Sequence, residues 1–355
     1  MTASLLVGGL LLAACGEDGD DDTAAQDGEA TEEEAPADDE SPMEEEDGEA
    51  APEIQLISEA DTATCDPTAN AAPIPDPEGT GEDLTEINFA NFSGWDENYV
   101  VYNLVKSALE EQGYTVNATE LEAGAAYQGV AGGDADALLD AWLPNTHGSS
   151  YVDMDAEEGA QLGDSLQDLG CWFDQGFLTI AVNADSPAES LANLADYQEE
   201  YGGRIVGIEP GAGLTRTTRE QVIPTYGLDD WDFSTSSSPA MLAELESAID
   251  ADENIVVTLW HPHWAYAAFD IRDLEDPEGA LGDAERLYAL GRPGFAEDYP
   301  NVAQLLQNLH LTDQQLLEIE DLLVVQYNRE QNERAVTEWL EDNPDFMEDW
   351  RAGEL

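Results

Sequence analysis

The chain has 355 residues, of which 80 are acidic and 10 basic, and its formal net charge is −70. Such a charge excludes a nucleic-acid binder, because phosphates are neutralised by patches of Lys and Arg, and it disfavours electrostatic binding to anionic lipid. A hydrophobic content of 42% with eight Trp excludes a wholly disordered chain. The length suits one large domain or two medium ones.

The acidic residues are spread along the whole chain. Residues 17–53 hold 19 Asp and Glu and no Lys or Arg, yet the rest of the chain still carries about −51. Self-repulsion at this level destabilises a compact state unless salt screens it. We therefore expect a halophilic protein that works in a high-salt surrounding.

The first fifteen residues indicate the compartment. An apolar run from Leu5 ends in Leu12-Ala13-Ala14-Cys15, the lipobox pattern, although the segment before it lacks the usual Lys or Arg. The run is too short to span a bilayer as a mature helix. The alternative interpretation is a buried N-terminal strand with a chance Cys. We expect a lipoprotein signal peptide over 1–14, a lipid on Cys15, and a place at the outer face of the cell membrane, in the periplasm or on the cell surface.

Acidic low-complexity sequence follows Cys15 to about Pro52 and is typical of a flexible tether, which we assign to 15–82. Two further cysteines remain, Cys65 and Cys171. In an oxidising compartment two leftover thiols most often form one disulfide. A metal-binding or nucleophilic role would need partners at a spacing that the sequence does not show.

The folded part alternates predicted strands with predicted helices. The strands are expected at 87–92, 115–121, 137–142, 177–182, 204–208 and 254–260. The helices are expected at 99–114, 125–131, 190–201, 215–226 and 239–249, and the chain is largely helical from Tyr299 on, with a capping start at Thr312. The alternation predicts a mostly parallel α/β sheet, repeated in two halves.

Three tryptophans lie at the ends of predicted strands: Trp95, Trp142 and Trp260. Ligands of open α/β sheets bind outside the carboxyl ends of the strands. Three indoles that converge there would hold a quaternary ammonium by cation–π attraction. One such Trp alone is more often a core residue, but the shared placement favours the cage. The other five are interpreted as packing residues: Trp172, Trp231, Trp264, Trp339 and Trp350.

A glycine-bearing turn, Gly207 to Thr215, leads from a predicted strand into a predicted helix. Backbone amides at such a helix start suit an anion, although many turns of this kind carry Gly for geometry alone. The turn matches neither the dinucleotide fingerprint nor the P-loop. His147 follows Trp142 by five residues, where it could donate to a carboxylate.

The pair His261 and His263 supports an alternative interpretation, a zinc-dependent hydrolase. Pro262 between them restricts the local backbone, and no third ligand has a recognisable spacing. We therefore expect no metal, no cofactor and no catalytic residue, and we place His310 on a helix as a surface or packing residue. A surface protein that binds other proteins but no small ligand is a further alternative.

The sequence resembles the glycine-betaine-binding proteins of osmoprotectant ABC importers, from about Ile87 to Asp349. Three motifs carry the resemblance: Asp140 to His147 (DAWLPNTH), Gly207 to Gly213 (GIEPGAG) and Val256 to Trp264 (VVTLWHPHW).

The resemblance implies an α/β, two-lobed periplasmic-binding-protein fold of type II, with the ligand in the interlobe cleft. Lobe I would comprise 83–178 and the returning segment 273–355, and lobe II would comprise 179–272. The ammonium cage would fall on Trp95, Trp142 and Trp260, and the carboxylate partners on His147 and the amides of Gly213 and Leu214. Leu214 and His261 depart from the family pattern, where Ile and a small polar residue are common, and the second change puts the ligand preference in doubt.

The residues and the resemblance agree on a ligand with both a methylated ammonium and a carboxylate, which is a small betaine. We expect an extracytoplasmic binding protein, not an enzyme, that captures glycine betaine and delivers it to ABC permease and ATPase subunits. Choline lacks the carboxylate and would leave buried donors unpaired, at a cost of about 1–3 kcal/mol. The alternatives are a binding protein for choline, carnitine or a sulfonium analogue.

Overall fold

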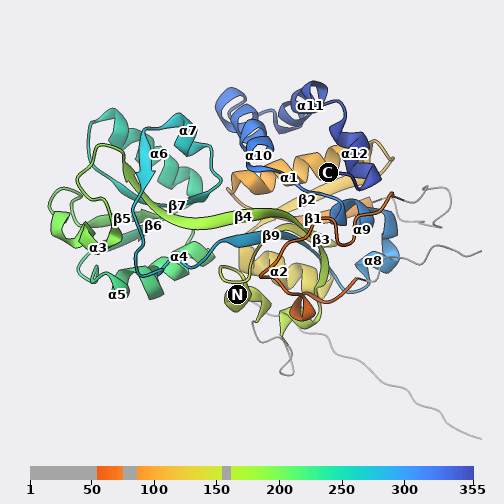
Figure 1. Ribbon diagram of the computed structural model, residues 1–355, viewed down its shortest axis with the longest axis horizontal. Helices are drawn as coiled ribbons and strands as arrows, with labels where there is room; N and C mark the ends of the chain where they lie inside the picture. Colours follow the sequence, from red (N-terminus) through yellow and green to blue (C-terminus); the bar gives the residue numbers. More distant parts are fainter. Residues whose placement is uncertain (1–53, 75–85, 154–160) are drawn as a thin grey trace, which may run out of the picture. The chain divides into compact units, whose positions relative to one another are not determined.

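One mixed sheet contains all the strands that the structure describes (Figure 1). The computed structural model describes residues 54–74, 86–153 and 161–355, which belong to the compact unit Ala50–Leu355. The strand order is β2-β1-β3-β9-β4-β7-β5-β6, with β8 paired to β4. The strands are β1 (Glu86–Phe92), β2 (Thr115–Leu121), β3 (Ala137–Leu143), β4 (Gln167–Asn183), β5 (Arg204–Gly207), β6 (Asp232–Thr235), β7 (Val256–His261), β8 (Ile271–Asp273) and β9 (Glu285–Gly291). The predicted signal peptide and Cys15 lie outside the described residues.

Helices connect the parallel strands, and α1 and α2 lie on opposite sides of β1 and β3 (Figure 1). The α-helices are α1 (Asp96–Glu110), α2 (Ala123–Gly132), α3 (Leu191–Leu194), α4 (Gly213–Thr217), α5 (Ile223–Thr225), α6 (Ser238–Asp250), α7 (Ala265–Ala268), α8 (Phe295–Asp298), α9 (Pro300–Gln307), α10 (Asp313–Glu320), α11 (Asn332–Asp342) and α12 (Phe346–Ala352). Shorter 3-10 and π turns are η1 (Ile57–Glu59), η2 (Gly148–Val152), η4 (Leu162–Asp164), η5 (Ala195–Tyr197), η6 (Thr218–Val222) and η7 (Asp321–Gln326). The predicted cap of α10 is present, since Oγ1 of Thr312 accepts the N–H of Gln315 at 3.3 Å.

The two ends of the sheet are parallel, as the alternation of strands and helices predicts, but its middle is not. Strands β2, β1 and β3 are parallel to one another, and so are β7, β5 and β6. Between them, β9 and β4 run antiparallel to their neighbours. The expectation of a mostly parallel sheet is therefore wrong at the centre. Strand β9 was not predicted, because it opens on the charged pair Glu285-Arg286 after a segment rich in Gly and Asp.

The long strand β4 belongs to both halves of the sheet. Its first part pairs with β9, and its last part, from Phe177 on, pairs with β7 and β8 (Figure 1). The first predicted lobe crossing, between 178 and 179, thus falls inside β4. The second was expected between 272 and 273, but β8 and Glu275 still pair with the second half, so the chain returns only after Glu275. We call the β2-β1-β3-β9 half lobe I and the β7-β5-β6 half lobe II.

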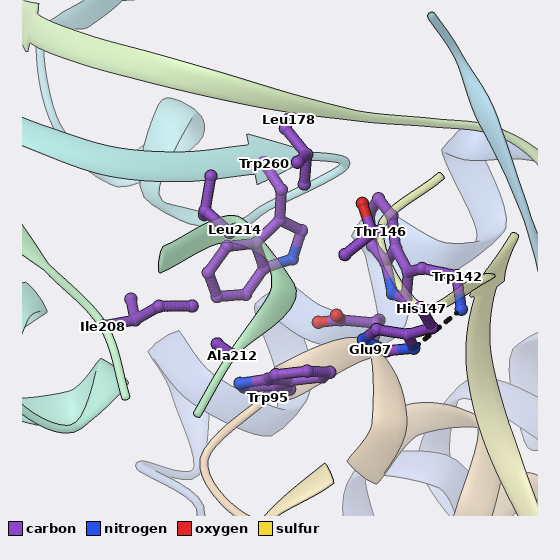
Figure 2. A pocket seen from close by; sticks show the side chains of 10 residues that line it. All are labelled: Trp95, Glu97, Trp142, Thr146, His147, Leu178, Ile208, Ala212, Leu214 and Trp260. Atoms are coloured by element: carbon purple, nitrogen blue, oxygen red, sulfur yellow. Dashed lines mark hydrogen bonds between the residues drawn. The ribbon is translucent and has the colours of Figure 1, made fainter. Parts of the chain in front are cut away.

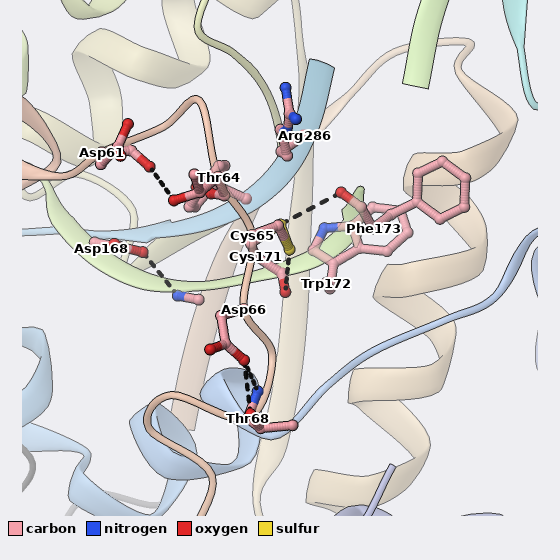
Figure 3. The surroundings of a disulfide bond; sticks show 12 residues. Asp61, Thr64, Cys65, Asp66, Thr68, Asp168, Cys171, Trp172, Phe173 and Arg286 are labelled. Carbon is pink, nitrogen blue, oxygen red and sulfur yellow. Dashed lines mark hydrogen bonds between the residues drawn. A yellow bond between two sulfur atoms is a disulfide. The ribbon is translucent and has the colours of Figure 1, made fainter. Parts of the chain in front are cut away.

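Residues 54–74 fall inside the range assigned to the acidic tether, and the structure corrects that assignment. This segment packs against lobe I: Ile57 is buried and its N–H donates to the carbonyl of Leu166 at 2.9 Å. Cys65 is joined to Cys171 of β4 by a disulfide, with 5.8 Å between the Cα atoms (Figure 3). Unlike the sequence before Pro52, the segment holds apolar side chains and a half-cystine, which let it pack against the folded domain.

Candidate ligand-binding site

A small cavity of about 20 Å³ lies between lobe I and lobe II (Figure 2). Its walls come equally from the two halves of the chain. The lining residues are Trp95, Glu97, Trp142, Thr146 and His147 from lobe I, and Leu178, Ile208, Ala212, Leu214 and Trp260 from β4 and lobe II. Five of the six residues predicted to bind the ligand are in this set, and the sixth, Gly213, lies between two of its members.

The three predicted cage tryptophans face one gap (Figure 2). Trp142 and Trp260 are the next-to-last residues of β3 and β7, and Trp95 directly precedes α1. All three are buried. The indole N–H of Trp142 donates to Oδ1 of Asp140 at 3.1 Å, while the Nε1 of Trp260 is buried and has no partner in the described part of the chain. The strand ends thus place three π-faces around one cavity, which suits a cation without N–H donors.

His147 presents a single donor to the cavity. Its Nδ1 lies 3.1 Å from the backbone N of Trp142 and 3.2 Å from the Tyr127 hydroxyl. Because a backbone N–H can only donate, Nδ1 is the acceptor and the ring proton is on Nε2. That Nε2 is buried and has no partner among the described residues. Burial, helped by the positive charge of Arg216, lowers the pKa of His147 to about 3, so the imidazole is neutral at physiological pH.

The amides of Gly213 and Leu214 lie in the first turn of α4, where helix geometry provides no acceptor. No acceptor for either amide occurs among the described residues. Gly213 itself fits only without a side chain, since a Cβ there would lie 2.4 Å from Cγ2 and 2.5 Å from the carbonyl oxygen of Thr146. The glycine therefore lets lobe II approach lobe I closely beside His147.

Several hydrogen bonds join the lobes, and three of them form one group beside the cavity. Each has one partner before β4 and one partner in the 209–216 segment of lobe II. The pairs are Trp95 Nε1 to Glu209 Oε2 at 3.3 Å, Arg216 Nη2 to Ser149 Oγ at 2.8 Å, and the Tyr151 hydroxyl to the carbonyl of Gly211. These bonds hold the lobes in a closed arrangement.

Glu97, whose carboxyl group lies in the cavity wall, was not predicted from the sequence. It lies two residues after Trp95, and in so acidic a chain nothing singles it out. Its side chain is 1% exposed and its Oε2 has no partner in the described residues. Burial raises the pKa of Glu97 well above its usual range, and the nearby Asp140 and Glu320 raise it further. Thr146, which packs against Gly213, was not predicted as a site residue either.

The histidines of the zinc interpretation have separate partners. Nε2 of His261 lies 2.9 Å from Oδ2 of Asp273, and Nδ1 of His263 accepts the N–H of Ala265 at 3.1 Å. Within 54–74, 86–153 and 161–355, no group of three His, Cys, Asp or Glu side chains is placed to hold a metal ion. His310 is half-buried and follows α9 rather than lying on a helix.

The five tryptophans interpreted as packing residues do not line the cavity. Trp172 and Trp350 are fully buried and donate their indole N–H to backbone carbonyls. Trp339 packs against Phe346, with 4.9 Å between the ring centroids. Trp264 is half-buried and donates to Oδ2 of Asp96 at 2.7 Å.

Fold and site together define a two-lobed α/β binding protein of the type II periplasmic kind. A family model described as the substrate binding domain of the ABC-type glycine betaine transport system (OpuAC) matches residues 85–342. The chain belongs to this family of transporter substrate-binding proteins, which are not enzymes. Such proteins of ABC importers act outside the cytoplasm. In the described part of the chain, no helix is both long and apolar enough to cross a membrane.

Three relatives show how far the similarity extends. The glycine betaine/carnitine transport binding protein GbuC of Listeria monocytogenes serotype 1/2a (strain 10403S) is 36% identical over 160 residues, which is 44% of this chain and 52% of that protein. The match thus spans about half the length of this relative. Lactococcal OpuAC, in its closed form with glycine betaine, superposes with a TM-score of 0.66 at 29% identity, over 75% of this chain and 99% of that one. An ABC-transporter choline binding protein in complex with choline superposes with a TM-score of 0.67 at 25% identity, over 78% of this chain and 94% of that one.

Proposed function

We propose that this protein captures a small betaine, glycine betaine first among them, and delivers it to the permease of an ABC importer. The observation that carries the proposal is the cavity lined both by three indoles and by His147, whose Nε2–H has no partner among the described residues. Trp95, Trp142 and Trp260 surround the trimethylammonium group. His147 and the amides of Gly213 and Leu214 donate to the carboxylate.

The ligand's two charged groups explain why both kinds of wall are needed. A quaternary ammonium has no N–H, so it is selected by shape and by the π-faces. The carboxylate is selected because it satisfies donors for which the described residues provide no partner. Choline satisfies the cage only, and we expect it to bind about 5- to 150-fold more weakly near neutral pH, equivalent to about 1–3 kcal/mol. Carnitine or a sulfonium analogue, which the same groups could hold, are the alternatives.

Titration of the intrinsic Trp fluorescence tests the site. The mature domain in high salt is titrated with glycine betaine and, separately, with choline at neutral pH. We expect a saturable change at micromolar glycine betaine and a much weaker response to choline. Saturation by choline alone would discard the roles of His147 and Gly213 while keeping the cage. No response to either ligand would contradict the proposed function and return attention to zinc analysis of the protein.

We also propose that Cys15 carries the lipid anchor, with the acidic sequence after it as the tether. The proposal is supported by the pattern Leu12-Ala13-Ala14-Cys15 and by a family whose members act outside the cytoplasm. Labelling of producing cells with a radioactive fatty acid tests it. Label should appear in the wild-type chain and be absent from Cys15→Ser, and equal label in both would contradict the anchor.

A further inference from the structure

Glu97 is the only carboxyl side chain among the ten residues that line the cavity. It is the second residue of α1, and Figure 2 shows its carboxyl group in the gap between Trp95 and Trp260. The side chain is 1% exposed, and Oε2 has no hydrogen-bond partner in the described part of the chain. An ionisable group so placed stands where the trimethylammonium group of the proposed ligand would lie.

The groups that face Glu97 are mostly acidic. Asp140 comes from β3 and Glu320 from the end of α10, and both are completely buried. Asp96, its neighbour on α1, is already paired with Arg329, so that cation is not free to pair with Glu97. His147 and His263 are neutral, because burial lowers their pKa values to about 3 and about 4.

The consequence is that Glu97 keeps its proton in the ligand-free cavity. Burial raises the pKa of this carboxyl well above its usual range, and repulsion from Asp140 and Glu320 adds to the effect. A neutral Glu97 suits a betaine, whose ammonium is balanced by its own carboxylate. An ionised Glu97 would leave one unbalanced negative charge in the closed site.

A quaternary ammonium without a carboxylate reverses this balance. With a protonated Glu97, the closed cavity would hold one unpaired positive charge. An ionised Glu97 neutralises that charge at short range, where the low local dielectric makes the attraction strong. We propose, on the basis of the proposed function, that Glu97 links ligand class to protonation: betaines bind with Glu97 protonated, whereas choline-like cations bind with the release of one proton from Glu97 to solvent.

Calorimetric titration in buffers of different ionisation enthalpy counts the protons directly. The full chain in high salt is titrated with glycine betaine and with choline between about pH 6 and 9, the range in which buried carboxyl groups titrate. For choline we expect about one proton released per ligand bound. The Kd for choline should therefore fall about tenfold for each unit by which the pH rises. For glycine betaine we expect no proton release and a Kd that does not change with pH.

The two ligands separate the outcomes. Choline binding without proton release, or no choline binding at any pH, overturns the role of Glu97 even when glycine betaine binds as expected. Failure of glycine betaine to bind overturns the proposed function instead, and proton-linked choline binding would then still support Glu97. His147 cannot supply the proton, because its pKa of about 3 leaves it deprotonated throughout the range.

A matched pair of variants assigns the proton. Glu97→Gln keeps the size of the side chain but cannot ionise, so its choline Kd should not depend on pH and no proton should be released. Glu320→Gln removes a buried acid that does not line the cavity, and it should retain the release of one proton. Proton release that persists in Glu97→Gln and disappears in Glu320→Gln would overturn the proposal. Burial raises the pKa of Asp140 to about 8, so this neighbouring acid also titrates in the range. Should Glu97→Gln fail to fold, Asp140→Asn decides: release of one proton should persist in this variant, and its loss would overturn the role of Glu97.

Discussion

Trp142 and His147 are tied to each other by two hydrogen bonds, from Trp142 N to His147 Nδ1 at 3.1 Å and from His147 N to the Trp142 carbonyl at 2.9 Å. The first bond fixes the tautomer that directs an N–H into the cavity, and the second fixes the turn that returns the ring beside Trp142. One strand end therefore supplies both a wall of the proposed cage and the proposed carboxylate donor. The five-residue spacing of these two residues is the feature that makes this possible.

Trp142→Ala should weaken glycine betaine binding by at least about 30-fold, which corresponds to about 2 kcal/mol for a desolvated cation–π contact. The substitution removes the indole but keeps the backbone N–H, so the tautomer of His147 is preserved. The loss can therefore be attributed to the cage. Calorimetric titration with glycine betaine measures it.

Trp339→Ala is the matched control for this loss. Trp339 is buried against Phe346 and donates to Oε2 of Glu318 at 3.1 Å, away from the cavity. We expect the free energy of unfolding to fall by about 3–5 kcal/mol while the Kd is unchanged. Equal affinities of the two tryptophan variants for glycine betaine would remove the cage assignment.

Gly213→Ala should prevent full closure of the lobes. The added Cβ would lie 2.4 Å from Cγ2 and 2.5 Å from the carbonyl oxygen of Thr146, and such contacts require the backbone to move. The movement displaces the amides of Gly213 and Leu214, so affinity for glycine betaine should fall by at least about tenfold, the equivalent of one lost hydrogen bond. Gly211→Ala is the control, because the nearest atom there is Oε2 of Glu122 at 3.6 Å. A similar loss in both variants would contradict the closure argument.

The sequence predicted the elements whose patterns are local. The alternation of apolar runs and helix caps located β1, β2, β3, β5 and β7 within a few residues. It failed at the centre of the sheet, where β9 begins with Glu285 and Arg286. The partners of β9 are fixed by pairing with strands more than a hundred residues away, and such long-range pairing leaves no local signal.

The site was predictable where residue chemistry is rare and unpredictable where it is common. Tryptophan and histidine are few in this chain, so their placement at strand ends was informative. Glu97 is one of 80 acidic residues, and its burial in the wall of the cavity, which the fold creates, is what distinguishes it. The pairing of Arg216 with Ser149 and of Trp95 with Glu209 depends on lobe closure, which no single segment encodes.

Glu320→Gln should stabilise the fold increasingly as the pH rises. Burial raises the pKa of Glu320 well above its usual range, so the folded state holds a proton that the unfolded state releases above about pH 4.5. The favourable contribution of this group is complete below that pH and is lost as the pH rises towards the folded-state pKa. The gain of the variant over wild type should therefore grow by about 1 kcal/mol for each pH unit.

Denaturant unfolding of both proteins at pH 5 and at about pH 8 measures this gain. Comparison of variant with wild type cancels the opposite effect of His147. The pKa of His147 is lowered, so its stabilising contribution is present above about pH 6.5 and is lost as the pH falls below it. A difference that stays constant between the two pH values would show that Glu320 does not titrate with a raised pKa.

The Cys65–Cys171 disulfide should leave no free thiol in the oxidised, unfolded domain when Cys15 is replaced by Ser. The bond joins two residues that are 106 positions apart in the sequence, and it holds the 54–74 segment to β4. Reduction, or the double variant Cys65→Ser and Cys171→Ser, should lower the free energy of unfolding by about 2–5 kcal/mol. Two thiols titrated in the unreduced protein would contradict the bond.

The unfolding midpoint should rise between low salt and molar salt. Outside residues 17–53 the chain carries about −51, and five of the ten basic side chains are already paired with acidic ones within the described residues. Most carboxylates therefore face like charges. At about 1 M salt the repulsion between them is screened beyond a few ångströms. Thermal unfolding in potassium chloride and, at matched ionic strength, in tetramethylammonium chloride measures the effect. A midpoint that does not rise in either salt would reject a high-salt working environment, whereas a rise only with tetramethylammonium would report occupation of the Trp cage by the cation.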